Sequence, residues 1–228
     1  MDVSAFQNLL FAAQGPALPS PMATRLALHG VWAIVLGSAA MLAVRQRARV
    51  WRWGLGLLVL LWTLLPGSLS PAYWLGLAFQ TPSSMSAVIC VACVLKREGL
   101  GQDRGAWRTA SGLHAQKILT LAGIALGWVL LLDTLACLPV SVYAWGFGAG
   151  ALAALLVLAA LLWLVLGSVA AALPFCVLSL FVLTRLPSGN VWDALLDPWL
   201  WLALQAGALV SVLRHWLTRR RLSAATRA

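Results

Sequence analysis

A long, uncharged and largely apolar run in the second half of the chain is the feature that most restricts its fold. From Gly148 to Leu183 there is no charged residue. A single helix over this run would measure about 54 Å at ~1.5 Å per residue, whereas the hydrocarbon core of a bilayer is only about 30 Å thick. The run therefore has to turn, and Gly167 followed by Ser168 is the predicted place. Two spanning helices are expected, about Phe147 to Leu166 and about Val169 to Leu183.

Composition extends this interpretation to the whole chain. Apolar residues make up 62% of the sequence and charged residues only 10%, whereas soluble proteins average about one half and one quarter. The sequence thus predicts an all-helical, polytopic transmembrane bundle. A net charge of +10 in a soluble protein would indicate nucleic-acid binding. Here the basic residues flank apolar segments, where charges set topology and contact lipid headgroups, so we expect membrane lipids and no nucleic acid as partners.

The remaining apolar stretches predict five further spanning helices. Their ranges are about Ala27 to Val44, Val50 to Leu65, Pro82 to Arg97, Lys117 to Leu138 and Pro198 to Thr218. Between the second and third, Ser70-Pro71 and Thr81-Pro82 each place a capping residue before a proline, which is a helix-start signal. We interpret Pro71–Phe79 as a short helix on the outer surface. A single tilted helix kinked at Pro82 is the alternative.

The polar segments divide the chain into three regions. Residues 1–25 are expected to form an extracytoplasmic segment with a short interfacial helix from Ala5 to Ala13, and they lack the basic start of a secretory signal peptide. Residues 26–218 form the helical bundle, and residues 219–228 form a basic tail. Residues 98–116 are the only long polar connection, and their glycines predict a mobile cytoplasmic loop.

The basic residues predict the orientation. All 16 Lys and Arg residues except Arg25 and Arg185 fall on one predicted side of the bundle. The positive-inside bias puts that side in the cytoplasm. Seven spans then place the N-terminus outside and the C-terminus in the cytoplasm, in a bacterial inner membrane. The residues expected to contact anionic lipid are Arg45, Arg47, Arg49, Arg52, Arg219, Arg220 and Arg221.

Asp133 is the most unusual polar residue, because it lies inside the outer end of a predicted spanning helix. Burying an ionised carboxylate in hydrocarbon costs several kcal/mol, so the group must be neutral, paired or beside a water-filled cavity. One interpretation is a proton or cation site. The other is a carboxylate that reaches the outer surface or pairs with Arg185 or Arg25.

Asp193 and Asp197 stand where acids favour a helix N-terminus. Asn190 and Asp193 also have the spacing of a capping box. The alternative is an outer acidic cluster of Asp133, Asp193 and Asp197 that collects cations, which requires the helices that carry them to touch.

A polar stretch lies at the start of the predicted helix at Pro82, and it contains Gln80, Thr81, Ser83, Ser84 and Ser86. Transporters bind substrate at interrupted helices, where backbone groups are free. We therefore select a candidate intramembrane or outer polar site made of Gln80, Thr81 and Ser84 with Asp133, Asp193 and Asp197. The simpler interpretation is that the hydroxyl groups only cap the helix.

Other chemistry has little support in the sequence. Cys90 and Cys93 have CxxC spacing on one helix face, which suits a redox pair or a soft metal, but buried apolar cysteines are the favoured interpretation. The histidines are scattered, and there is no P-loop, HExxH or GxSxG motif. The last predicted helix also has no lysine for a retinal Schiff base. We therefore expect no metal, no cofactor and no catalytic site.

These observations favour a non-catalytic accessory or assembly subunit of a membrane complex, with a membrane-protein partner or a homo-oligomer. The alternative is a small transporter or permease that uses Asp133 and the broken helix around Gln80 to Ser84. An enzyme acting on a lipid or a thiol comes third, because no constellation of residues supports it.

Overall fold

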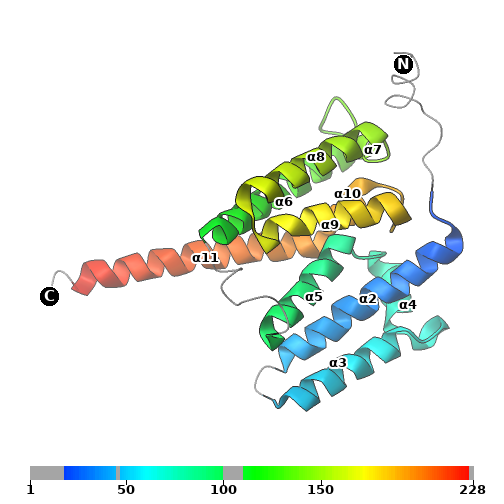
Figure 1. Cartoon of the computed structure of the whole chain (residues 1–228), viewed down its shortest axis with the longest axis horizontal. Coiled ribbons are helices and arrows are strands. Elements are labelled where there is room, and N and C mark those ends of the chain that lie inside the picture. Colours follow the sequence, from blue (N-terminus) through cyan, green and yellow to red (C-terminus); the bar gives the residue numbers. More distant parts are fainter. Residues whose placement is uncertain (1–17, 45–46, 100–109, 226–228) are drawn as a thin grey trace.

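The structure is a computed structural model that describes residues 18–44, 47–99 and 110–225. In these ranges it is all-helical, without strands (Figure 1). The elements are α2 (Pro21–Ala43), α3 (Arg49–Thr63), η1 (Gly67–Leu69), α4 (Pro71–Phe79), α5 (Ser84–Glu98), α6 (Ala110–Thr134), α7 (Val142–Trp145), α8 (Ala149–Leu166), α9 (Val169–Thr184), α10 (Val191–Leu195) and α11 (Pro198–Ala225). The predicted interfacial helix from Ala5 to Ala13 lies outside the described residues.

The uncharged run turns where the sequence predicts. Gly167 ends α8 in the left-handed conformation, with φ of 56°, which costs least without a Cβ atom. Ser168 then caps α9, because its side chain accepts a hydrogen bond from the backbone N–H of Ala171 at 3.2 Å. The prediction of two helices joined at this point is confirmed.

A serine cap followed by a proline sets the starts of α2 and α4. Ser20 accepts a hydrogen bond from the N–H of Ala23, and Pro21 follows it, so α2 begins before the predicted Ala27. Ser70 accepts from the N–H of Ala72 ahead of α4, which has the predicted bounds. The structure has a short α4 and a separate α5, so the alternative of a single helix kinked at Pro82 is wrong.

The predicted loop over residues 98–116 is partly wrong. Glu98 is the last residue of α5, and α6 already begins at Ala110. Ala115 is fully buried against Ala170 and Ala171 at the start of α9, so burial stabilises the first turns of α6 as helix. The other end of α6 stops at Thr134 rather than near Leu138, since Ala136 adopts a left-handed φ of 55°.

Each predicted spanning segment is helical, but the helices differ in length. Within the described residues, four are long and apolar enough to cross a membrane: Pro21–Ala43, Ser111–Thr134, Ala149–Leu166 and Pro198–Arg220. Helices α3 and α5 have 15 residues each and α9 has 16, which is about 22 to 24 Å of helix. The four long apolar helices are consistent with a membrane protein.

The helices form two groups (Figure 1). α2 packs against α3 and α5, while α8 packs against α9, and α6 lies against both α9 and α11. A buried apolar core that includes Leu178, Phe181 and Val191 holds the second group together. We call the end of the bundle that carries Asp133, Asp193 and Asp197 the acidic end. The opposite end, where Arg49, Arg52 and Lys96 lie near Glu98, is called the basic end.

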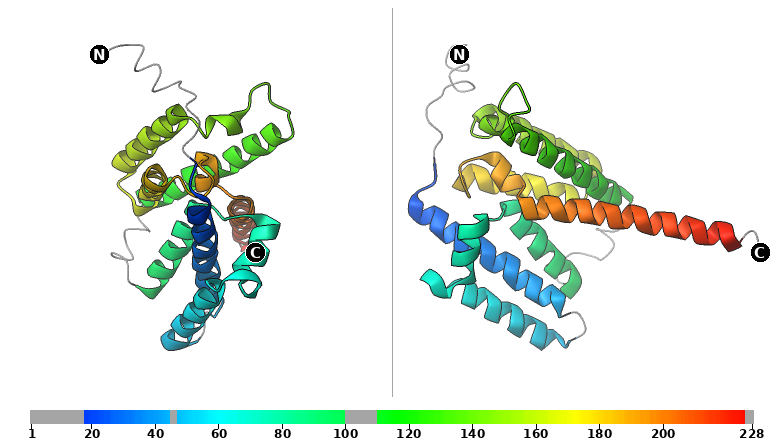
Figure 2. Two further views of the ribbon diagram at one scale, coloured as in Figure 1. Left: turned by 90° about the vertical axis from the view of Figure 1, so that its right-hand side faces the viewer. Right: turned by 180° about the vertical axis from the view of Figure 1, so that it is seen from behind.

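Helix α11 leaves the bundle after its first turns. Trp201 and Leu204 lie against Gly127 and Gly123 of α6, and the indole N–H of Trp201 donates to the carbonyl of Ile124 at 3.2 Å. From residue 209 to residue 220 every α11 side chain is exposed, and this half of the helix extends away from the other helices (Figure 2).

Candidate functional site

Two helix interruptions meet at the acidic end. α4 ends at Phe79 and α10 ends at Leu195, and in each case a longer helix follows after a short break. Ser83 caps the first long helix, accepting a hydrogen bond from the N–H of Ser86 at 3.1 Å. Asp197 caps the second, because its Oδ1 accepts from the N–H of Leu200 at 2.8 Å. The N-termini of α5 and α11 lie next to each other, because Asp197 also accepts a hydrogen bond from the backbone N–H of Ser83. We call this contact the junction.

The carboxylate of Asp197 joins these N-termini. Its Oδ2 accepts hydrogen bonds from the backbone N–H of Ser83 at 2.8 Å and from the hydroxyl of Ser83 at 2.7 Å. The hydroxyl of Ser86 donates to the same oxygen. Asp197 is only 7% exposed and Ser83 is fully buried. An anion between two helix N-termini is electrostatically favourable, and hydrogen bonds to a charged acceptor are strong. Asp197 thus ties the first group of helices to α11.

Asp133 and Asp193 belong to a neighbouring network centred on Tyr143. Oδ2 of Asp133 accepts from the backbone N–H of Tyr143 at 2.7 Å and from the Ser141 hydroxyl at 3.3 Å. The Tyr143 hydroxyl donates to Oδ2 of Asp193 at 2.8 Å. Burial and this hydrogen bond to a carboxylate raise the pKa of Tyr143 above its ordinary value of 10.0. The phenol therefore stays protonated, and Tyr143 links the two acids through its hydroxyl, which contacts Asp193, and its backbone N–H, which contacts Asp133.

The acidic cluster considered from the sequence is thus divided between two networks. Asp133 and Asp193 share Tyr143, whereas Asp197 bonds to α5. Asn190 caps α10 as predicted, accepting from the N–H of Trp192 at 3.0 Å. The backbone N–H of Asn190 donates to the Ser188 hydroxyl at 3.2 Å, so Ser188 takes the place that the capping-box spacing assigned to Asp193.

The predicted polar stretch contributes different residues from those singled out. Gln80 has an exposed side chain and a φ of 61°, and its carbonyl accepts from the indole N–H of Trp32 at 2.9 Å. Thr81 and Ser84 are half-buried. The hydroxyls that reach a carboxylate are those of Ser83 and Ser86, and that carboxylate belongs to Asp197 rather than to Asp133.

The sequence contained signals for each of the two helix ends at this junction, but it did not predict that the two ends are in contact. Ser83 and Ser86 have the spacing of a helix cap, and Asp197 precedes a proline that begins a helix. Each signal concerns one helix end, and the contact between the ends depends on tertiary packing. Tyr143 gave no local signal at all.

Two of the arginines expected to contact lipid lie beside a buried acid at the basic end. Glu98, whose side chain is 3% exposed, accepts from Nη2 of Arg52 at 2.7 Å and from Nε of Arg49 at 3.2 Å. The indole of Trp53 also donates to it, at 3.4 Å. The Arg52 side chain is 18% exposed and that of Arg49 is 57% exposed. These contacts join α3 to α5.

The other candidate lipid contacts are more accessible. Arg47, Arg219 and Arg220 are exposed, and Arg220 lies over the ring of Trp216 at 3.8 Å. Arg45 and the side chain of Arg221 lie outside the described residues.

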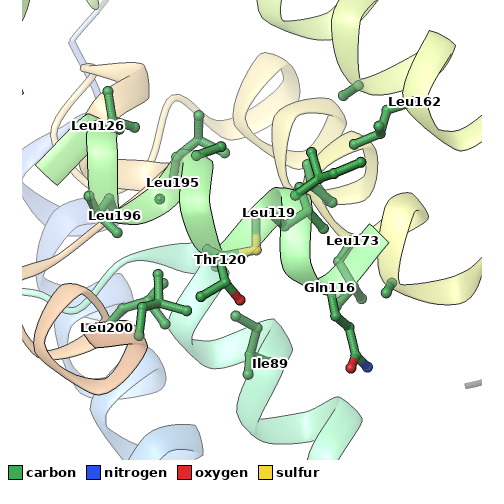
Figure 3. A pocket seen from close by; sticks show the side chains of 18 of the residues that line it. Ile89, Gln116, Leu119, Thr120, Leu126, Leu162, Leu173, Leu195, Leu196 and Leu200 are labelled. Carbon is green, nitrogen blue, oxygen red and sulfur yellow. The ribbon is translucent and has the colours of Figure 1, made fainter. Parts of the chain in front are cut away.

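Two cavities lie beside α5. The larger, about 510 Å³, lies among α5, α6, α8, α9 and the first turns of α11 (Figure 3). The smaller, about 460 Å³, lies among α2, α5 and α9. Both linings are mainly apolar and contain no carboxylate and no histidine; Gln116 and Thr120 supply polar atoms to the larger one. The ionisable side chains in these linings are Lys96, which lines both cavities, and Cys93, which lines the larger one.

Metal and thiol chemistry gain no support from the described part of the chain. It has no group of three or more His, Cys, Asp or Glu residues that could hold a metal ion. Cys90 is half-buried, Cys93 is exposed, and both are free thiols.

No family model, no curated protein and no solved structure matches the chain.

Proposed function

We propose that this protein is a multi-pass protein of a bacterial inner membrane that serves as an accessory or assembly subunit of a larger membrane complex. The observation that carries this proposal is that the described carboxylates are bonded within the chain itself. Glu98, Asp133, Asp193 and Asp197 each accept hydrogen bonds from the chain's own donors, and they hold helices together. Among the described residues the acids thus have structural roles, which suits a protein without transport or catalytic chemistry.

The proposed topology has seven crossings, with the acidic end outside and the basic end in the cytoplasm. The positive-inside bias supports this orientation. The shorter helices α3, α5 and α9 would cross with local thinning of the bilayer, at a modest cost per ångström of mismatch.

The proposed partner surface lies on α11. Ala203, Gly207 and Ser211 are spaced by four residues, so they share one helix face, and all three are exposed. A Cβ atom on Gly207 would meet nothing within 4 Å. Small residues at this spacing let two transmembrane helices approach closely. We assign this face to a spanning helix of the partner protein.

Affinity purification in mild detergent from the native host tests this proposal. The wild-type protein should retain a stoichiometric membrane-protein partner, and Gly207→Leu should lose it because a bulky side chain separates the helices. Gly150→Leu is the matched control, since a Cβ at Gly150 on α8 also meets nothing within 4 Å. Retention of the partner by Gly207→Leu, or a wild-type protein that purifies alone, would contradict the proposal.

A small transporter is the second candidate, and the junction at Asp197 favours it. Secondary transporters bind substrates where interrupted helices meet, and here a buried carboxylate occupies such a place. Asp197 would take the role that the sequence suggested for Asp133. Potential-driven proton uptake into proteoliposomes that is lost in Asp197→Asn and kept in Asp133→Asn would favour this candidate over the accessory subunit.

A further inference from the structure

Helix α5 is flanked by the two cavities along most of its length. Met85, Ile89 and Cys93 line the larger cavity, and because they are four residues apart they form one face of the helix. Ser84, Val88 and Val91 line the smaller cavity on a neighbouring face. Each cavity therefore runs from near the acidic end of α5 toward the basic end.

The two cavities converge on one cation. Ala92, Lys96 and Leu173 line both of them, and Lys96 is the only charged residue in either lining. Ala92 on α5 and Leu173 on α9 form the wall between the cavities. At the basic end of the larger cavity, Gln116 adds a polar amide to a mainly apolar surface (Figure 3).

We propose that these cavities bind one diacyl phospholipid with an anionic headgroup, with its phosphate at Lys96 and one acyl chain in each cavity. The shape argues for two chains and one head, since two apolar spaces join at a single ammonium group. Lys96 also interacts within the chain, but an ammonium has three donors and can bind a phosphate oxygen as well. A partner helix, about 10 Å across, would need one wide groove instead.

The direction in which the site runs across the membrane matches a lipid of the cytoplasmic leaflet. Lys96 stands at the basic end, and both cavities extend from it toward the other end of α5. This inference rests on the proposed membrane insertion and orientation, but not on the accessory role. Lys96 is a different contact from the arginines at the ends of α2, α3 and α11.

Native mass spectrometry of the purified, delipidated full chain tests the headgroup. Phosphatidylglycerol should bind saturably with one lipid per chain and more tightly than phosphatidylcholine with the same acyl chains. Lys96→Gln should weaken phosphatidylglycerol binding about fivefold and phosphatidylcholine binding less, because choline offsets the charge of the phosphate in that lipid. Lys117→Gln is the matched control, because Lys117 is exposed and lines neither cavity. Equal binding of the two lipids by the wild type, or equal effects of the two lysine variants, would overturn the proposal.

The acyl chains are tested separately. Ala92→Leu narrows both cavities at their shared wall and should lower the binding of both lipids, while its elution from a sizing column stays that of the wild type. Phosphatidylglycerol with a photoreactive acyl chain should label peptides that contain Ile89 and Leu173. Labels confined to the outer surface of α11, or displacement by soluble glycerophosphate at equal concentration, would overturn the two-chain site.

Failure of this inference can be told apart from failure of the proposed function. A protein that is released from membranes by alkaline carbonate would refute membrane insertion. A protein that needs detergent for extraction but binds no phosphatidylglycerol would refute the lipid site alone.

Discussion

Asp197→Asn is the substitution that most directly tests the junction between α5 and α11. The amide oxygen can keep the three donors that meet Oδ2, but the amide nitrogen then faces the N–H of Leu200, which donates to Oδ1 at 2.8 Å in the wild type. Losing this hydrogen bond to a charged acceptor costs about 1.5 to 3 kcal/mol. The other three bonds weaken, because their acceptor is no longer charged.

We therefore expect a total loss of about 4 kcal/mol in the free energy of unfolding, which lowers the unfolding midpoint by about 10 °C in a protein of this size. The assay is thermal unfolding in mild detergent, followed by size-exclusion chromatography of heated samples. Asp133→Asn is the control, since among the described residues its carboxylate accepts from Tyr143 and Ser141, in a more exposed place, and we expect a loss of about 1 kcal/mol. An Asp197→Asn midpoint within about 3 °C of the wild type, or a larger effect of Asp133→Asn, would refute this reasoning.

Two further predictions concern the other polar networks. Glu98→Gln should cost roughly 2 to 3 kcal/mol, because Arg52, which is 18% exposed, keeps its charge without its carboxylate partner; the same melting assay checks this, and an unchanged midpoint would contradict it. The raised pKa of Tyr143 means that its contribution to stability is complete below pH 10 and is lost as the pH rises through the higher pKa of the folded state. An absorbance titration at alkaline pH should show a late phenolate component that disappears in Tyr143→Phe. In Asp193→Asn this component should move to lower pH but stay late, because burial, the larger cause of the raised pKa, remains; an unchanged titration of Asp193→Asn would contradict the role of the hydrogen bond.

The helices could be predicted because their signals are local. Apolar runs, a proline after a capping residue, and a glycine before a serine determined α4 and the turn at Gly167 without reference to the rest of the chain. The beginning of α6 could not be predicted in this way. Ser111 and Gly112 look like loop residues, and they are helical because the following Ala115 is buried against α9.

Individual residues of the candidate site could be predicted from the sequence, but the contacts between them could not. Asp197 was expected at a helix N-terminus, and the serines of the polar stretch were expected to cap a helix. Their distance in sequence, 114 residues between Ser83 and Asp197, gave no reason to pair them. Glu98 lay in an expected loop, so its burial between Arg49 and Arg52 had no sequence signal. Long-range contacts of polar groups depend on how helices pack, and one sequence does not encode that packing in any local pattern.

The most direct test of the proposed role is photo-crosslinking in cells of the native host. A photoreactive amino acid at Ser211 lies on the α11 face that includes Gly207, and the same label at Leu209 lies on another face. The accessory-subunit account predicts one discrete adduct with a different membrane protein from position 211 and none from position 209. Adducts with lipid alone, or with a second copy of this chain, would contradict it.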